Sequence, residues 1–472
     1  GKTVMANMIT AFLGKKQDSD SIFKSLKISQ NDLYNNYRNQ YNVISIDFSK
    51  MPRDCDSYTD YIDRIETNLI RDLRKEYPQI EIYEDDSAAD VLETIFEECD
   101  QQRFVFVLDE WDFIFHKDFV TEENKKQYVL FLSNLLKDRS YVQLTYMTGI
   151  LPIAMYSSGS ELNMFWEYTM VSEAKYNEYF GFTEKEVIKL CEKNGELDFE
   201  ELERWYNGYL TVKGIQIYNP RSVVKALQNS YCESYWTNTG AMDEVAEYLK
   251  YNTLEIREDV IEMVSGNEID IHIDEEFRAG QKAPKTKEEI YSAMIILGFL
   301  AYHDGYLKIP NQELMKEFEK ALKDEEFGEV SEIINNSRKL LKYTVNRDEE
   351  AVVKLVHDIH NSEIPILQYN DENSLACVIT LAYLSARDIY RIEREEKTGK
   401  GYADFSFHPR RKSDTALIIE LKKNETAQKA IQQIKDKEYV QKFKKEYNNI
   451  LAVAICYDFN NKEHTCKIEK IN

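Results

Sequence analysis

The stretch GYADFSFHPRRKSDTALIIELKK, residues 401–423, decides how the last part of the chain folds. Its apolar run TALIIE, residues 415–420, predicts a buried strand, and YADFSF, residues 402–407, predicts a second strand. The polar turn between them would join the two strands as an antiparallel pair. Asp404 and Glu420 would then meet at one position of the sheet, where charged groups need a partner.

Strand side chains alternate, so Glu420 and Lys422 point to the same face while Leu421 points into the core. The carboxylates of Asp404 and Glu420 would repel each other unless a divalent cation lies between them. Mg²⁺ or Mn²⁺ suits oxygen ligands of this kind and would activate water at a phosphodiester. Lys422 would orient the water or stabilise the transition state. The alternative is a plain hairpin with a surface ion pair between Glu420 and a lysine.

The first residues, GKTVMANMITAFL, predict the second half of a P-loop and the helix after it. The backbone around Gly1 and the helix N-terminus would hold the phosphates of ATP. Lys2 would reach the β- and γ-phosphates, and Thr3 would ligate Mg²⁺. The first glycine of the loop is not in the sequence, so the N-terminal part of the P-loop is missing. The alternative is an ordinary helix start with a solvated lysine.

Three apolar stretches predict strands of one parallel sheet: YNVISIDFS (41–49), FVFVLDEWDFIF (104–115) and YVQLTYMTGI (141–150). Asp109 and Glu110 follow the second strand, as in a Walker B motif. Asp109 would bind Mg²⁺, and Glu110 would polarise the attacking water. Thr148 ends the third strand and would contact the γ-phosphate or the water. The ligand site would lie at the C-terminal ends of these strands.

These motifs, together with GFTEKEV at Gly181, WYNGYL at Trp205 and IYNPRSV at Ile217, resemble the AAA-ATPase-like proteins of bacteria and archaea. The resemblance covers nearly the whole chain and implies an α/β fold in three parts. A P-loop domain with a parallel sheet would span residues 1–178. A helical, winged-helix-like middle region would span 179–363, and a PD-(D/E)xK nuclease-type domain 364–472. Gly208 would permit a positive-φ turn.

The resemblance gives Asp404, Glu420 and Lys422 the roles of the D…ExK residues of the nuclease superfamily. Glu372 matches the acidic residue on the first helix of such domains and would support the metal.

Gln433 matches the polar residue on the helix after the ExK strand, where we expect a catalytic role. Lys437 and Tyr439 lie near it and would contact a nucleic-acid backbone. Ala403 stands where the superfamily pattern has a proline, which metal binding does not need.

Composition limits the classes of function. The 472 residues are too many for one ordinary core, and 43% hydrophobic with 31% charged residues fits a soluble globular protein. The net charge of −24 argues against nonspecific coating of nucleic acid. Residues 408–447, however, hold eleven Lys and Arg against six Asp and Glu, a local charge of +5 that suits a polyanion.

The start of the chain has no leader pattern, and its apolar runs are too short to span a bilayer, so we expect no membrane contact. Seven cysteines are scattered singly, which predicts a reducing cytoplasm with neither a zinc site nor a disulfide framework.

We predict an ATP-binding protein in which the N-terminal domain controls a metal-dependent nuclease acting on nucleic acid, with DNA favoured over RNA. One alternative is an ATP-dependent switch or adaptor whose nuclease-like domain binds a partner without cutting. Many aromatic residues, including 32 Tyr, fit a protein partner or a homo-oligomer. A plain ATPase acting on proteins is a further alternative.

Overall fold

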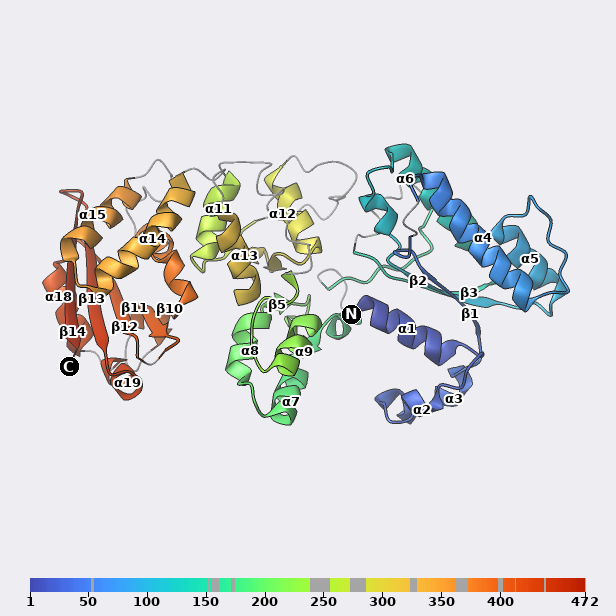
Figure 1. Cartoon of the computed structure of the whole chain (residues 1–472), viewed down its shortest axis with the longest axis horizontal. Coiled ribbons are helices and arrows are strands. Elements are labelled where there is room, and N and C mark those ends of the chain that lie inside the picture. Colours follow the sequence, from blue (N-terminus) through green and yellow to red (C-terminus); the bar gives the residue numbers. More distant parts are fainter. Residues whose placement is uncertain are drawn as a thin grey trace. The chain divides into compact units, whose positions relative to one another are not determined.

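The computed structural model of the chain divides into two compact units (Figure 1). The first unit comprises Gly1–Thr183, Thr211–Arg221 and Ile273–Gly298, and the second comprises Glu184–Leu210, Ser222–His272 and Phe299–Asn472. The structure describes residues 1–51, 55–150, 153, 161–170, 175–237, 255–271, 286–322, 329–361, 372–397, 402–411, 413–436 and 439–471. Within these residues no helix is both long enough and apolar enough to cross a bilayer.

The first unit is built on a parallel sheet in the order β1-β2-β3, as the sequence predicts. Its strands are β1 (Asn42–Asp47), β2 (Phe104–Asp109) and β3 (Val142–Met147). The central strand β2 is buried along its whole length. Parallel strands covered on both faces read as continuous apolar runs, which explains why FVFVL shows no alternation.

Helices cover both faces of this sheet, with α1 on one side and α4, α5 and α6 on the other (Figure 1). Their bounds are α1 Lys2–Leu13, α4 Tyr58–Glu76, α5 Ala88–Glu98 and α6 Glu122–Leu136. Helix α1 packs through Ala6 against Val105 and Val107 of β2. The other three begin at side-chain caps, each of which accepts a bond from a backbone N–H of the first turn: Ser57, Ser87 and Thr121.

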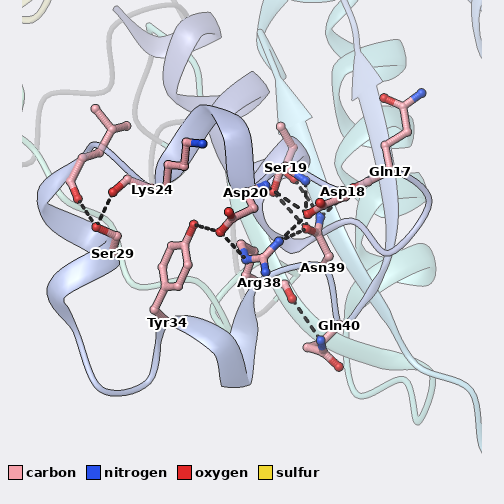
Figure 2. A network of polar contacts seen from close by, with 12 residues as sticks. Gln17, Asp18, Ser19, Asp20, Lys24, Ser29, Tyr34, Arg38, Asn39 and Gln40 are labelled. Carbon is pink, nitrogen blue, oxygen red and sulfur yellow. Dashed lines mark hydrogen bonds and ion pairs between the residues drawn. The ribbon is translucent and has the colours of Figure 1, made fainter.

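The connection between α1 and β1 contains three short helices: α2 (Asp20–Phe23), η1 (Lys27–Gln30) and α3 (Tyr34–Tyr37). Asn39, which Figure 2 shows within a network of polar contacts, closes the connection. Its φ of 56° lies in the left-handed region, which asparagine tolerates. Its side-chain amide nitrogen donates to the carbonyls of Ala11, Gly14 and Gln17. Its side-chain oxygen accepts from the backbone and hydroxyl of Ser19 and from Arg38. One asparagine therefore ties both ends of the connection together.

The remaining described elements of the first unit are η2 (Phe113–His116), η4 (Asn177–Tyr179), β4 (Phe182–Thr183), β6 (Gln216–Tyr218) and α12 (Lys287–Ile296). Strands β4 and β6 pair antiparallel. The capping box at the start of α12, between Thr286 and Glu289, fixes where that helix begins.

The C-terminal part of the second unit is a five-stranded sheet in the order β10-β11-β12-β13-β14. Its strands are β10 (Tyr390–Lys397), β11 (Tyr402–Pro409), β12 (Ala416–Lys423), β13 (Ile450–Asp458) and β14 (Glu463–Ile471). Strand β12 pairs antiparallel with β11 and parallel with β13, and the other two pairings are antiparallel. The predicted antiparallel pair formed by residues 402–407 and 415–423 is thus present.

Helices also flank this sheet: α14 (Glu329–Val345), α15 (Glu349–His360), α17 (Glu372–Ala382), α18 (Ala427–Asp436) and α19 (Tyr439–Glu446). Ala416 and Ile418 of β12 pack with Ile431 of α18 and Phe443 of α19 in one core. Helix α17 contacts the same strand, and α15 contacts β14. A short 3-10 helix, η7 (Leu384–Asp388), leads from α17 into β10.

The rest of the second unit is mostly helical, as the sequence predicts for the middle of the chain. Its elements are α7 (Glu184–Asn194), α8 (Phe199–Tyr206), β5 (Tyr209–Leu210), α9 (Pro220–Asn229), α11 (Glu255–Val264), β7 (Ile269–Asp270), β8 (Ala301–His303), β9 (Tyr306–Lys308) and α13 (Gln312–Leu322). Strands β8 and β9 form a hairpin, with Asp304 and Gly305 at positive φ in its turn. The predicted boundary near residue 363 falls on residues outside those described, and the three-part division stays a prediction.

Replacing Gly208 with alanine should destabilise the second unit by more than about 2 kcal/mol. Gly208 has φ +111°, and a Cβ built on it would lie 1.8 Å from the carbonyl oxygen of Pro310. Backbone cannot yield as a flexible side chain would, so the clash adds to the cost of the left-handed φ. Urea unfolding followed by circular dichroism measures the loss.

Gly266 supplies the matched control, because it has φ +93° with no atom within 4 Å of the added Cβ. Gly266→Ala should lower the free energy of unfolding by about 1 kcal/mol, the cost of placing alanine in a left-handed backbone conformation. Equal losses for the two variants would show that the contact with Pro310 does not matter.

Lowering the pH from 7 to 5 should reduce the stability of the second unit by about 2 kcal/mol through His464 alone. Burial, and then His360 and His357 beside it, lower the pKa of His464 from 6.5 to about 3. The unfolded chain takes up the proton near pH 6.5, so this contribution is complete above pH 6.5 and is lost as the pH falls toward 3. Urea unfolding at pH 7, 6 and 5 measures the slope.

His464→Gln should remove that slope, whereas His303→Gln in the β8–β9 hairpin should keep it. His464 Nε2 lies 2.9 Å from Nδ1 of His360, and its Nδ1 lies 3.4 Å from Nδ1 of His357. An unchanged slope in His464→Gln would assign the pH dependence to other groups.

Candidate nucleotide and nuclease sites

The ends of β2 and β3 bring Asp109 and Thr148 together. The backbone N–H of Thr148 donates to the carbonyl of Leu108 at 2.8 Å, which continues the parallel pairing past the end of β3. The Thr148 hydroxyl then donates to Oδ1 of Asp109. Two of the residues predicted to bind the nucleotide and its metal are therefore in direct contact at the C-terminal edge of the sheet.

Asp109 has a buried oxygen suited to a cation. Its side chain is only 4% exposed, and among the described residues its Oδ2 has no hydrogen-bond partner. An anionic oxygen held out of water without a donor is costly. A divalent cation with oxygen ligands would relieve that cost, so the residues present fit Mg²⁺ at Asp109.

Glu110 is held in a strained conformation next to Asp109. Its φ is +53°, in the left-handed region that non-glycine residues seldom adopt. Burial raises the pKa of its carboxyl, Lys2 opposes that rise, and Asp112, Asp109 and Asp47 add to it. Because the charge of Lys2 acts on the Glu110 carboxyl, the start of α1 lies near the acidic residues that follow β2. A carboxylate with a raised pKa accepts a proton more readily, as a residue that polarises water should.

Gly1, Lys2 and Thr3 form the start of α1 and are all exposed. Gly1 is the N-cap, and no side chain caps the first turn. The open backbone N–H groups there are the kind of donors that bind phosphate at helix N-termini.

Sequence reasoning missed two acidic residues at this site, Asp47 and Asp112. Asp47 ends β1 and is the register partner of Asp109. Asp112 is 1% exposed, and its Oδ2 accepts a bond from the backbone N–H of Ile150 at 2.8 Å. Two sequence signals could have identified them: Asp112 follows Asp109 and Glu110 in LDEWD, and Asp47 ends the apolar run VISID.

In the second unit, β11 and β12 bring Asp404, Glu420 and Lys422 together. The pairing of Phe405 with Ile419, continued by one residue, sets Asp404 opposite Glu420. Asp404 Oδ2 accepts a bond from the backbone N–H of Leu421 at 2.6 Å, which holds its carboxylate beside β12. Lys422 Nζ lies 3.0 Å from Oε1 of Glu420.

The charges of this cluster fit a cation. The side chain of Glu420 is 1% exposed and that of Lys422 is 23% exposed, so the ion pair is largely withdrawn from water. Two carboxylates with one ammonium leave a net negative charge on two inner strands of the sheet, β11 and β12. The described residues contain no group of three or more His, Cys, Asp and Glu that could hold a metal. Among the described residues, a metal here would be held by Asp404 and Glu420.

The other predicted nuclease residues that the structure describes lie on the flanking helices. Glu372 is the first residue of α17, but its side chain lies outside those the structure describes. Gln433 is half-buried on α18, the helix that packs on β12 and β13. Lys437 and the side chain of Tyr439 are likewise outside the described part of the chain.

Comparison with known proteins finds two family models that match separate parts of the chain. Residues 1–158 match the family model described as predicted AAA-ATPase, and residues 370–468 match that of the PD-(D/E)XK nuclease superfamily. A Walker-type ATPase of Pyrococcus abyssi is similar in structure, at 12% sequence identity and a TM-score of 0.33, over 62% of this chain and 88% of the other. The comparison with curated proteins found no match. The chain thus combines an AAA-ATPase-like N-terminal region with a C-terminal domain of the PD-(D/E)XK nuclease superfamily.

Proposed function

We propose that the protein is a metal-dependent nuclease under the control of ATP, and that DNA is its substrate. The observation that carries the proposal is the cluster of Asp404, Glu420 and Lys422 on neighbouring strands, with Glu420 buried. A binding module would gain little from withdrawing three charged groups together from water, whereas phosphodiester cleavage uses each of them.

At this site a bound Mg²⁺ or Mn²⁺ would supply an activated water and positive charge beside the scissile phosphate. Asp404 and Glu420 would hold the metal, with the Leu421 N–H fixing the Asp404 carboxylate in place. Lys422 would donate hydrogen bonds to the phosphate oxygens as negative charge builds up on them. The net charge of +5 over residues 408–447 supplies attraction for the nucleic-acid backbone.

In the first unit, Lys2 and the start of α1 would bind the phosphates of ATP, and Asp109 would hold Mg²⁺. Glu110 would polarise the attacking water, with Thr148 positioned on the Asp109 carboxylate. We propose that the nucleotide state of this site sets the activity of the nuclease site.

A cleavage assay on the full-length protein tests the proposal. Linear DNA, circular DNA and RNA are incubated with Mg²⁺ or Mn²⁺, with and without ATP, beside an EDTA control. Cutting of DNA that needs the metal and responds to ATP is the expected result. If neither DNA nor RNA is cut, and calorimetry detects no Mn²⁺ binding, the nuclease proposal is wrong. The alternative, an adaptor whose nuclease-like domain binds a partner without cutting, is then favoured.

A further inference from the structure

The side chain of Asp112 forms a hydrogen bond with a segment outside the helix that Asp112 begins. It is the N-cap residue of the 3-10 helix η2, yet its side chain makes no capping bond to that helix. Aspartate at such a position ordinarily accepts a bond from the turn that follows. Here Oδ2 accepts instead from the backbone N–H of Ile150, two residues after Thr148.

Two further bonds run beside this one and link the same two segments. The Thr148 N–H donates to the Leu108 carbonyl at 2.8 Å, and the Trp111 N–H donates to the Thr148 carbonyl at 3.0 Å. With the bond from Ile150 to Asp112, the chain leaving β3 is fastened to the chain leaving β2 on both sides of Thr148.

Gly149 makes this close approach possible. A Cβ built on it would lie 2.4 Å from two atoms of the Trp111 ring and 2.7 Å from Oδ1 of Asp112. A side chain at position 149 would force residues 148–150 to move away from Trp111 and Asp112. The approach therefore depends on residue 149 having no side chain.

We propose that Asp112 is a positioning residue of the ATPase site, which holds the Thr148 hydroxyl on Asp109 through the backbone of residues 149 and 150. The inference rests on the proposed ATPase function. Asp112 does not touch the nucleotide in this role, so its loss should affect turnover far more than nucleotide affinity. Misplacing a catalytic group by about 1 Å costs on the order of 100-fold in rate.

The test uses the full-length protein and compares Asp112→Ala with Asp112→Asn. The alanine variant should lower the kcat for ATP by about 10- to 100-fold and leave KM near its original value. The asparagine variant keeps an oxygen that can accept from Ile150 N–H, so it should keep most of the turnover. Exchange of the Ile150 amide with solvent deuterium, followed by mass spectrometry, reports the hydrogen bond without reference to activity. It should be faster in the alanine variant only.

Each result has one meaning. If Ile150 exchange rises in Asp112→Ala while kcat stays unchanged, or if Asp112→Asn is as slow as Asp112→Ala, the positioning role is wrong although the ATPase function stands. A rise in KM with kcat preserved would also overturn it. If the unmodified protein binds no ATP and does not hydrolyse it, the proposed function itself has failed, and this inference with it.

Discussion

Replacing Lys422 with alanine should lower metal-dependent cleavage of DNA by about 100-fold or more. The ammonium lies 3.0 Å from the buried Glu420 carboxylate and is the positive side chain of the cluster that would meet a scissile phosphate. The same variant should bind Mn²⁺ at least as tightly as the unmodified protein, because a cation that competes for Glu420 is gone. Cleavage rates and calorimetric titration with Mn²⁺ measure the two effects.

Lys423 provides a matched control, since it is the next residue along β12 and is exposed near the ring of Phe459. Strand alternation turns it away from Glu420, so Lys423→Ala should leave cleavage unchanged. Asp404→Asn and Glu420→Gln should abolish both cleavage and Mn²⁺ binding. Normal cutting by Lys422→Ala would show that the cluster is not the catalytic site.

Replacing Glu110 with glutamine should lower ATP turnover by about 100-fold or more while ATP still binds. The substitution keeps the size of a side chain held at φ +53° and removes the charged oxygen that would polarise water. Since Lys2, which would bind the phosphates, is untouched, the Kd for ATP should change little. A phosphate-release assay and binding of a fluorescent ATP analogue separate the two quantities.

Glu123→Gln is the control for charge, because Glu123 is exposed in the first turn of α6. It should leave turnover as it is. If ATP controls the nuclease, Glu110→Gln should also alter the response of DNA cleavage to ATP. Unchanged hydrolysis in Glu110→Gln would remove Glu110 from the mechanism.

Much of the fold follows from local sequence signals. The continuous apolar run of FVFVL predicted the buried strand β2, and TALIIE predicted the strand β12, which contains Glu420 and ends at Lys423. The positive φ predicted for Gly208 was also correct. These features depend on a few neighbouring residues, whose backbone preferences and burial can be judged from their order alone.

Other features depend on residues far apart in the chain and had no local signal. Glu313 on α13 is buried and accepts bonds from the Ser222 hydroxyl and from the backbone of Tyr235 and Trp236. Nothing near Glu313 in the sequence indicates those donors.

The nucleotide site shows the same limit. The strand-end positions of Asp109 and Thr148 could be expected from strand order. The bond from Ile150 to Asp112 could not, because it depends on how two segments approach where Gly149 has no side chain. The catalytic and binding roles of these residues are predictions, which the variants described above test.

The closure of the α1–β1 connection by Asn39 has a consequence for how this region can change in evolution. Since one side chain joins the carbonyl of Gly14 to the start of β1, the mostly exposed residues between Phe23 and Tyr34 can grow or shrink without shifting the strand. Doubling the length of a flexible loop adds only about 0.6 kcal/mol to its closure. Homologues should therefore differ in length here while they keep the asparagine, and a tag inserted near Lys27 should leave Asp47 at its place beside Asp109.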